Sequence, residues 1–151
     1  MEVNRDEFEV MDIGAGSGRV GRQLQKQGYK KIDAVDASEG LLEHAKKTGA
    51  YRNCVKTFLG NGTYPFEEHR DHYDLVASSG VWLSGHIPAA GMDEVVQCLK
   101  KGGKWVTAMR TIYYAEGHAE GYREQLEKLQ DEGLITLVKQ YTFDRGVPGH
   151  D

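Results

Sequence analysis

The chain has few cysteines, few prolines and no long hydrophobic run. Among its 151 residues there are two cysteines and three prolines. Cys54 and Cys98 stand far apart, so neither a disulfide framework nor a metal knuckle is indicated. No stretch approaches the roughly 20 apolar residues that a membrane span requires, and residues 1–9 lack the apolar core of a signal peptide. We therefore expect a cytoplasmic protein with no membrane partner.

An excess of positive charge is also absent. Lysine and arginine number 19 against 23 aspartates and glutamates, which gives a net charge of -4 and a pI near 5.9. Such a chain has no general attraction for phosphates, so we do not expect nucleic acid as a partner. Hydrophobic residues make up 39% of the chain and there are 19 glycines, an ordinary globular composition. The length predicts a single domain over residues 1–151.

Short apolar runs alternate along the chain with helical patterns. The runs that predict strands cover residues 8–13, 31–36, 54–59, 73–78, 105–109 and 134–138, the last extending toward residue 143. Helical spacing joins Val20 to Leu24, Leu41 and Leu42 to Ala45, Met92 to Val95, Val96 and Leu99, and Tyr122 to Leu126 and Leu129. This alternation predicts a doubly wound, mostly parallel α/β sheet. In such sheets ligands bind beyond the carboxyl ends of the strands, which directs attention to residues 12–18.

Residues 12–18 read DIGAGSG, and they link the first predicted strand to the first helix. Glycines allow tight turns and close approach of a ligand to the backbone, so the segment predicts a nucleotide-like ligand. Two interpretations compete, because Gly16, Gly18 and Gly21 formally match a dinucleotide fingerprint. That fingerprint should begin directly after the strand, and a frame beginning at Gly14 meets Arg19 where glycine is required. A nicotinamide oxidoreductase is therefore disfavoured but stays an alternative.

The pattern Asp-x-Gly-x-Gly-x-Gly resembles motif I of the class I S-adenosylmethionine-dependent methyltransferases, and later segments continue the resemblance. Residues 36–42 read DASEGLL, similar to that family's Asp-x-Ser-x-x-Met/Leu-Leu signature. Residues 60–62 read GNG where the family often has Gly-Asp-Ala, and residues 99–103 read LKKGG, similar to its Leu-Lys-Pro-Gly-Gly turn. Residues 85–88 read GHIP, and together with Arg110 they resemble the Williams-Beuren-region methyltransferase-like proteins.

The resemblance implies a Rossmann-like fold, S-adenosylmethionine as cofactor and S-adenosylhomocysteine as product. It places Asp12 toward the methionine ammonium group and Asp36 on the two ribose hydroxyls, although Asp36 alone could instead help to cap a helix. It also places Asn61, where the family usually has a carboxylate, near the adenine amino group. The cofactor-binding residues that it implies are Asp12, Gly14, Ala15, Gly16, Gly18, Asp36, Ala37, Asn61, Gly62 and Ser78.

His86 is the candidate catalytic residue. It follows the fourth predicted strand, beside the expected position of the methyl group, where an imidazole can act as a general base. The alternative is a loop histidine that only orders the backbone. Trp82, Tyr113 and Tyr114 either line an acceptor pocket or serve in ordinary packing.

A second cluster of polar residues follows the third predicted strand. It consists of Glu67, Glu68, His69, Asp71 and His72. The cluster resembles a metal site only superficially, since the spacing suits a helix only loosely. We expect a solvated charged turn and no metal.

Two parts of the family's complete fold have no counterpart in the sequence. These are the helical segment before the first strand and the antiparallel seventh strand between strands five and six. We expect a fragment in which strands five and six pair directly, or in which a neighbouring chain fills the gap by dimerisation or strand exchange. Loss of the helical segment would expose the cofactor to water.

The acceptor is expected to be a small molecule. Residues 78–81 read SSGV where DNA and protein-amide N-methyltransferases carry Asn/Asp-Pro-Pro-Tyr, which counts against methylation of an exocyclic or side-chain amide nitrogen. The predicted function is methyl transfer from S-adenosylmethionine to this unidentified acceptor. The alternative is a noncatalytic module that binds the cofactor or a partner.

Overall fold

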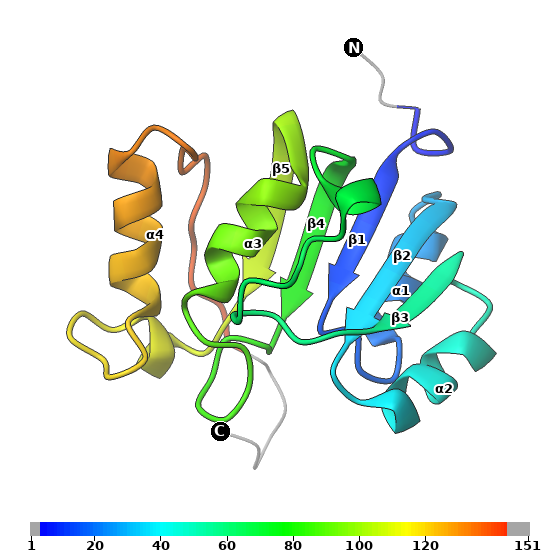
Figure 1. The fold of residues 1–151 in the computed structure, drawn as a ribbon, viewed down its shortest axis with the longest axis horizontal. Helices are drawn as coiled ribbons and strands as arrows, with labels where there is room; N and C mark the ends of the chain where they lie inside the picture. The colour runs from blue at the N-terminus through cyan, green and yellow to red at the C-terminus, as the bar shows by residue number, and fades with distance from the viewer. Residues whose placement is uncertain (1–3, 145–151) are drawn as a thin grey trace.

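A computed structural model describes residues 4–144 of the chain. Its centre is a sheet of five parallel strands in the order β3-β2-β1-β4-β5 (Figure 1). In chain order the elements are β1 (Glu9–Ile13), α1 (Arg19–Lys26), β2 (Lys31–Asp36), α2 (Glu39–Lys47), β3 (Asn53–Lys56), η1 (Glu67–His69), β4 (Tyr73–Ser79), α3 (Gly91–Cys98), β5 (Leu99–Ala108), η2 (Thr111–Tyr114) and α4 (Tyr122–Asp131). The predicted doubly wound α/β fold is confirmed.

Helices cover both faces of this sheet. On one face Ala34 of β2 packs with Leu42 of α2, and Val10 of β1 packs with Leu24 of α1. On the other face the buried side chains of α3 and α4 form the main core with Met11, Ile13, Val35 and Val76 of the strands. Figure 1 shows α3 in front of the sheet and α1 behind it. The chain adds β2 and β3 on one side of β1 and then β4 and β5 on the other side. The strand order therefore reverses between β1 and β4, and such sheets bind ligands at the point of reversal.

Local signals begin and end the helices as the sequence predicts. The hydroxyl of Ser38 accepts a hydrogen bond from the amide of Leu41 at 3.2 Å and so caps α2. Helix α4 is followed by Gly133, whose φ of 78° is the left-handed conformation that ends a helix. Helix α1 begins after Gly18 without a side-chain cap and without an acidic residue in its first turn. Its first amides are therefore left to other partners.

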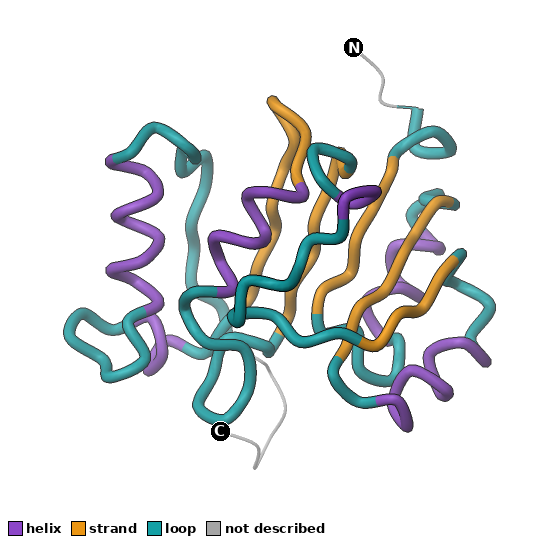
Figure 2. Tube along the Cα trace, in the orientation of Figure 1, coloured by secondary structure: helices purple, strands orange, loops and turns teal. Residues whose placement is uncertain are grey.

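The predicted sixth strand is wrong. Residues 134–144 form no strand and run as a loop beside α4 (Figure 2). The amide of Leu134 donates to the carbonyl of Leu129 at the end of α4, and the amide of Leu137 donates to the side chain of Gln130. A strand needs a neighbour for its backbone groups, and within the described residues β5 pairs only with β4.

Smaller differences concern the ends of predicted elements. Leu99, expected on a helix, is the first residue of β5. The register of β4 and β5 shifts between Tyr73 and Leu75, so that residues 100–103 bulge from the pairing. Strand β3 ends at Lys56, three residues before the predicted boundary. Within residues 4–144, β1 is the first element and β5 is the last strand.

Candidate functional site

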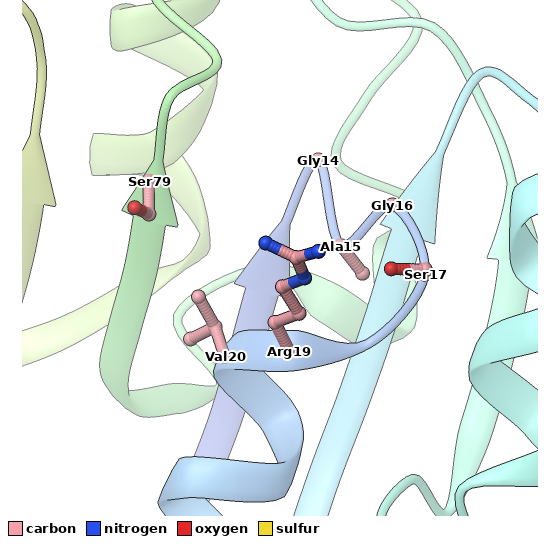
Figure 3. A pocket seen from close by; sticks show the side chains of 7 residues that line it. All are labelled: Gly14, Ala15, Gly16, Ser17, Arg19, Val20 and Ser79. Atoms are coloured by element: carbon pink, nitrogen blue, oxygen red, sulfur yellow. The ribbon is translucent and has the colours of Figure 1, made fainter. Parts of the chain in front are cut away.

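The segment between β1 and α1 folds back over the carboxyl end of β2. The amides of Gly14 and Ala15 both donate to the carbonyl of Val35, at 2.9 and 3.2 Å. Gly14, Gly16 and Gly18 all have positive φ, at 68°, 56° and 97°. L-residues with side chains rarely adopt this conformation, so the loop requires its glycines. Figure 3 shows the loop rising above the end of β1.

Space as well as conformation demands glycine at the first position of this loop. A β-carbon on Gly14 would lie 2.2 Å from Cγ1 of Val81, which follows β4. The loop therefore lies directly against the end of β4.

Asp36, at the end of β2, ties the glycine loop to the start of α2. Its Oδ2 accepts a hydrogen bond from the amide of Gly16 at 2.9 Å, and its Oδ1 accepts one from the amide of Ser38 at 2.8 Å. Each carboxylate oxygen keeps acceptor capacity beyond one hydrogen bond. The side chain is half-buried, and it belongs to the last residue of β2, at the carboxyl edge of the sheet.

Asp12 lies beneath the loop and is almost completely buried, with 1% of its surface exposed. Its Oδ2 accepts a hydrogen bond from the hydroxyl of Tyr51 at 2.6 Å, and that hydroxyl accepts one from the amide of Gly21 at 3.1 Å. Burial raises the pKa of Asp12 to about 7, with a smaller contribution from the charge of Asp36 and opposition from the Tyr51 hydrogen bond. Asp12 is therefore a carboxyl group that exchanges a proton near neutral pH.

A cavity of about 250 Å³ opens beside the loop. Its walls are formed by Gly14, Ala15, Gly16, Ser17, Arg19, Val20 and Ser79 (Figure 3). Three of the predicted residues, Gly14, Ala15 and Gly16, line it. The other four, Ser17, Arg19, Val20 and Ser79, were not among the predicted residues. In Figure 3 the Arg19 side chain extends from the first turn of α1 along the loop, on the side that faces Ser79.

Ser78 was expected at the cofactor, but its side chain lies on the other face of β4. Its hydroxyl oxygen accepts hydrogen bonds from the indoles of Trp82 at 3.1 Å and Trp105 at 3.0 Å, and it donates to Thr107 at 2.9 Å. Successive strand residues point to opposite faces, so the next residue, Ser79, faces the cavity. The alternation of side chains along β4 is the sequence signal that could have identified Ser79. Using it required knowing which face of the sheet holds the site.

Asn61 and Gly62 follow β3 and are exposed. The side-chain oxygen of Asn61 accepts hydrogen bonds from the amide and the hydroxyl of Thr63, at 3.0 and 2.6 Å. The loop is held to α3 by Glu94, whose Oε2 accepts from the amide of Gly60 at 2.5 Å. Ala37, also exposed, follows Asp36. None of Ala37, Asn61 and Gly62 lines the 250 Å³ cavity.

His86 lies in the exposed turn between β4 and α3 and lines no described cavity. Tyr122 of α4 steadies this turn, since its hydroxyl donates to the backbone carbonyl of Ile87 at 2.7 Å and lies 3.1 Å from that of Leu83. Trp82 is fully buried in the core, so its ring is packing. Tyr113 and Tyr114 lie in η2 and are half-buried.

The two histidines of the charged turn face different partners. Nδ1 of His69 lies 3.1 Å from the hydroxyl of Tyr64, and Nε2 of His72 lies 3.3 Å from Glu9. Among residues 4–144, no group of three or more histidine, cysteine, aspartate or glutamate side chains is arranged to hold a metal ion. No helix in that range is long and apolar enough to cross a membrane.

The family described as "Methyltransferase domain" matches residues 10–103, the part that carries the glycine loop, Asp36 and Ser79. The chain belongs to this family. Its members are S-adenosylmethionine-dependent enzymes with this Rossmann-like fold, so S-adenosylmethionine is the cofactor and the nicotinamide alternative is set aside.

Among curated proteins, the chain is 26% identical over 136 residues to methyltransferase-like protein 27 of Homo sapiens, covering 90% of this chain and 54% of that protein. It is 28% identical over 92 residues to N-terminal Xaa-Pro-Lys N-methyltransferase 1 of Homo sapiens, covering 60% and 40%. The chain therefore spans about half the length of the curated relatives it matches. The names of these relatives give no common acceptor.

Solved structures share the fold. A TehB-like methyltransferase from Corynebacterium glutamicum superposes with a TM-score of 0.61 at 21% identity, over 82% of this chain and 64% of that one. A methyltransferase from Mesorhizobium loti gives 0.56 at 23% identity, over 70% and 48%. At this identity the likeness concerns the arrangement of the sheet and its helices.

Proposed function

We propose that this chain binds S-adenosylmethionine across the carboxyl edge of its sheet and transfers the methyl group to a small-molecule acceptor. The observation that carries the proposal is the link between Asp36 and the glycine loop. The carboxylate holds the loop through the amide of Gly16 and keeps lone pairs free at the edge where nucleotides bind in such sheets.

The residues of this edge fit that cofactor. The loop turns at three glycines, so that its backbone offers a surface without side chains beside a cavity of about 250 Å³. The first turn of α1 has no acidic residue and carries Arg19, which suits a carboxylate such as that of the methionine portion. The ribose hydroxyls have their acceptor in Asp36.

Asp12 acts through its charge in this proposal. Its carboxyl lies under the loop and takes the ionised form when a positive group, such as the methionine ammonium, approaches. Asn61 is the proposed partner of the adenine amino group. Of the two serines at the end of β4, Ser79 is preferred to Ser78 as the cofactor contact, because the Ser78 hydroxyl is committed to two indoles.

When bound, S-adenosylmethionine supplies a methyl group on a positively charged sulfur, which departs as a neutral thioether. The protein then needs mainly to position the acceptor in line and to remove its proton. His86 stays the proposed base for that proton, since it follows β4 at the same edge of the sheet. Replacing His86 by Gln should lower the turnover rate, while cofactor affinity stays unchanged. An unchanged turnover rate would exclude His86 as the base.

We propose that the chain belongs to the Williams-Beuren-region methyltransferase-like branch that its GHIP segment and Arg110 resemble. The match to methyltransferase-like protein 27 over 90% of the chain supports a relative of that general type. The second candidate function is a noncatalytic cofactor-binding module. It is favoured by the position of the proposed base His86, which lines no described cavity.

Calorimetric titration with S-adenosylhomocysteine, with NADH as the parallel control, tests the proposal. We expect saturable binding of the first compound alone. Asp36→Ala should weaken that binding by about 1.5–3 kcal/mol, because it removes the proposed ribose acceptor and the tie to Gly16. Glu43→Ala removes an exposed carboxylate of α2 that pairs with Lys46, and should have no effect. Equal affinity in the wild type and Asp36→Ala would contradict the proposal, and binding without turnover on acceptor mixtures would select the noncatalytic module.

A further inference from the structure

Tyr51 lies in the segment between α2 and β3 and contacts three parts of the cofactor edge. Its hydroxyl donates to Oδ2 of Asp12 at 2.6 Å and accepts a hydrogen bond from the amide of Gly21 at 3.1 Å. Its ring also packs against the end of the glycine loop, since a β-carbon on Gly18 would lie 3.2 Å from Cε2 of Tyr51. One side chain thus supports β1, the loop and α1 together.

Asp12 has no cationic partner in the part of the chain that the structure describes. It is 1% exposed, and none of the ion pairs within residues 4–144 includes it. Burial of a carboxylate without an opposite charge is unfavourable, so such a group tends to keep its proton. The protein therefore holds a carboxyl group for which it supplies no compensating charge.

The groups around Asp12 are acidic or neutral. Its paired residues in β2 and β4 are both alanine. Burial, assisted by the charge of Asp36 and opposed by the hydrogen bond from Tyr51, raises the pKa of Asp12 to about 7. Burial also raises the pKa of the Cys54 thiol on β3, so this neighbour is uncharged at neutral pH. Besides the amide of Gly21 on α1, the Tyr51 hydroxyl is the group that favours the ionised form.

A cation bound at the glycine loop would change this balance. S-adenosylmethionine and S-adenosylhomocysteine both carry an ammonium group, which the proposed function directs toward Asp12. An opposite charge nearby favours the ionised form of a carboxyl group, and water screens this attraction little at a buried site. Binding of either compound is therefore expected to drive the proton from Asp12.

We propose that cofactor binding is coupled to the loss of one proton from Asp12, and that Tyr51 is the positioning residue that sets the pH range of this coupling. The proton passes from the carboxyl group to the buffer, and the carboxylate remains as the counter-ion of the ligand ammonium group. The Tyr51 hydroxyl donates to Oδ2 and stabilises the charge that remains. The place of the ammonium group rests on the proposed function, whereas the action of Tyr51 on Asp12 does not.

Calorimetry with S-adenosylhomocysteine in two buffers of different ionisation enthalpy, such as phosphate and Bis-Tris, counts the protons released. We expect about one proton at about pH 6 and about a tenth of one at about pH 8. Because the complex holds fewer protons than the free chain, affinity should rise about tenfold from about pH 5.5 to about pH 7. Methylthioadenosine lacks the amino-acid portion and should release no proton.

The variant Asp12→Asn identifies the source of the proton. Asparagine has nearly the size of aspartate and still offers an oxygen to Tyr51, but it has no proton to lose. This variant should bind S-adenosylhomocysteine without proton release and with an affinity that does not change between about pH 5.5 and about pH 7. Proton release equal to that of the wild type would overturn the proposal.

The variant Tyr51→Phe keeps the ring and removes the donor. The proton should then be held more tightly by Asp12, so S-adenosylhomocysteine affinity should fall about tenfold at about pH 7 but only about twofold at about pH 8.5. A merely structural role would weaken binding equally at every pH, and that result would overturn the role of Tyr51. Tyr29→Phe, at a ring packed beside Phe8, is the matched control and should change neither affinity nor proton release.

Other outcomes separate this inference from the proposed function. Binding of S-adenosylhomocysteine to the wild type without proton release overturns the coupling and leaves the proposed function standing. Equal proton release by S-adenosylhomocysteine and methylthioadenosine also overturns it, because the ammonium group would not be the cause. These two results need no variant, so they decide the coupling even if Tyr51→Phe fails to fold. Absence of S-adenosylhomocysteine binding at every pH would contradict the proposed function itself and this inference with it.

Discussion

The ring of Tyr51 lies directly against the backbone of α1 at Gly21. A β-carbon on Gly21 would come within 2.2 Å of Cζ and 2.3 Å of the hydroxyl oxygen of Tyr51. Through the same hydroxyl, which donates to Asp12 and accepts from the Gly21 amide, Tyr51 joins β1, α1 and the segment before β3. The glycine that completes the formal dinucleotide fingerprint is thus explained by packing against a tyrosine, with no need for a second nucleotide.

Gly21→Ala should destabilise the fold. The added methyl group has to displace the Tyr51 ring, and overpacking of this kind costs about 1–3 kcal/mol. Gly40→Ala on α2 is the matched control, because the nearest atom to its new β-carbon is 4.0 Å away. That control should be neutral or stabilising by up to about 1 kcal/mol, since alanine favours a helix. Urea unfolding measures both, and equal stabilities would refute the close approach at Gly21.

Asp12 should make stability depend on pH in a direction opposite to an ordinary ion-paired carboxylate. Its pKa in the folded protein is raised to about 7, mainly by burial, so the folded state binds more protons than the unfolded state between pH 4 and 7. The free energy of unfolding of the wild type should therefore fall relative to Asp12→Asn as pH rises through this range, by up to about 4 kcal/mol. Parallel curves for the two proteins would show that Asp12 keeps an ordinary pKa.

Substitutions at Ser78 and Ser79 should have different effects, the first on stability and the second on cofactor binding. Ser78→Ala removes the acceptor of the Trp105 indole, and should cost about 1–3 kcal/mol of stability with little change in S-adenosylhomocysteine affinity. Ser79→Phe places a ring at the cavity wall from an exposed position, so it should weaken affinity and leave stability nearly unchanged. Thermal unfolding and calorimetry measure the two effects, and the reverse pattern would refute the assigned faces of β4.

Glu94 should act on the loop that follows β3. Its side chain is 4% exposed and accepts from the amide of Gly60, while its Oε1 has no hydrogen-bond partner. Glu94→Ala leaves the Gly60 amide without this acceptor and should lower stability by about 1–3 kcal/mol and weaken S-adenosylhomocysteine binding. Gln97→Ala on the same helix removes an exposed side chain that bonds Arg70 and serves as the control. If Glu94→Ala left the affinity for S-adenosylhomocysteine unchanged, the hydrogen bond between Gly60 and Glu94 would not support the adenine contact proposed for Asn61.

Much of the fold follows from local patterns. Five of the six predicted strands and the four helices are confirmed, because apolar periodicity reports which side of an element is buried and Ser38 and Gly133 mark helix ends locally. The sixth strand failed although its composition suits a strand. A strand forms only where the edge of a sheet can pair with its backbone groups. The residues of the segment itself carry no information about whether such an edge lies nearby.

The sequence by itself determined the α/β class, the glycine loop and the acid at the end of β2, since each is a short segment whose conformation is dictated by its own residues. Only the tertiary structure decided that Ser79 and not Ser78 faces the cavity, that Asp12 is buried against Tyr51, and that Arg19 lines the loop cavity. Asp12 and Tyr51 are 39 positions apart. Contacts over such separations depend on how whole elements pack, and strand alternation alone leaves the choice of face open.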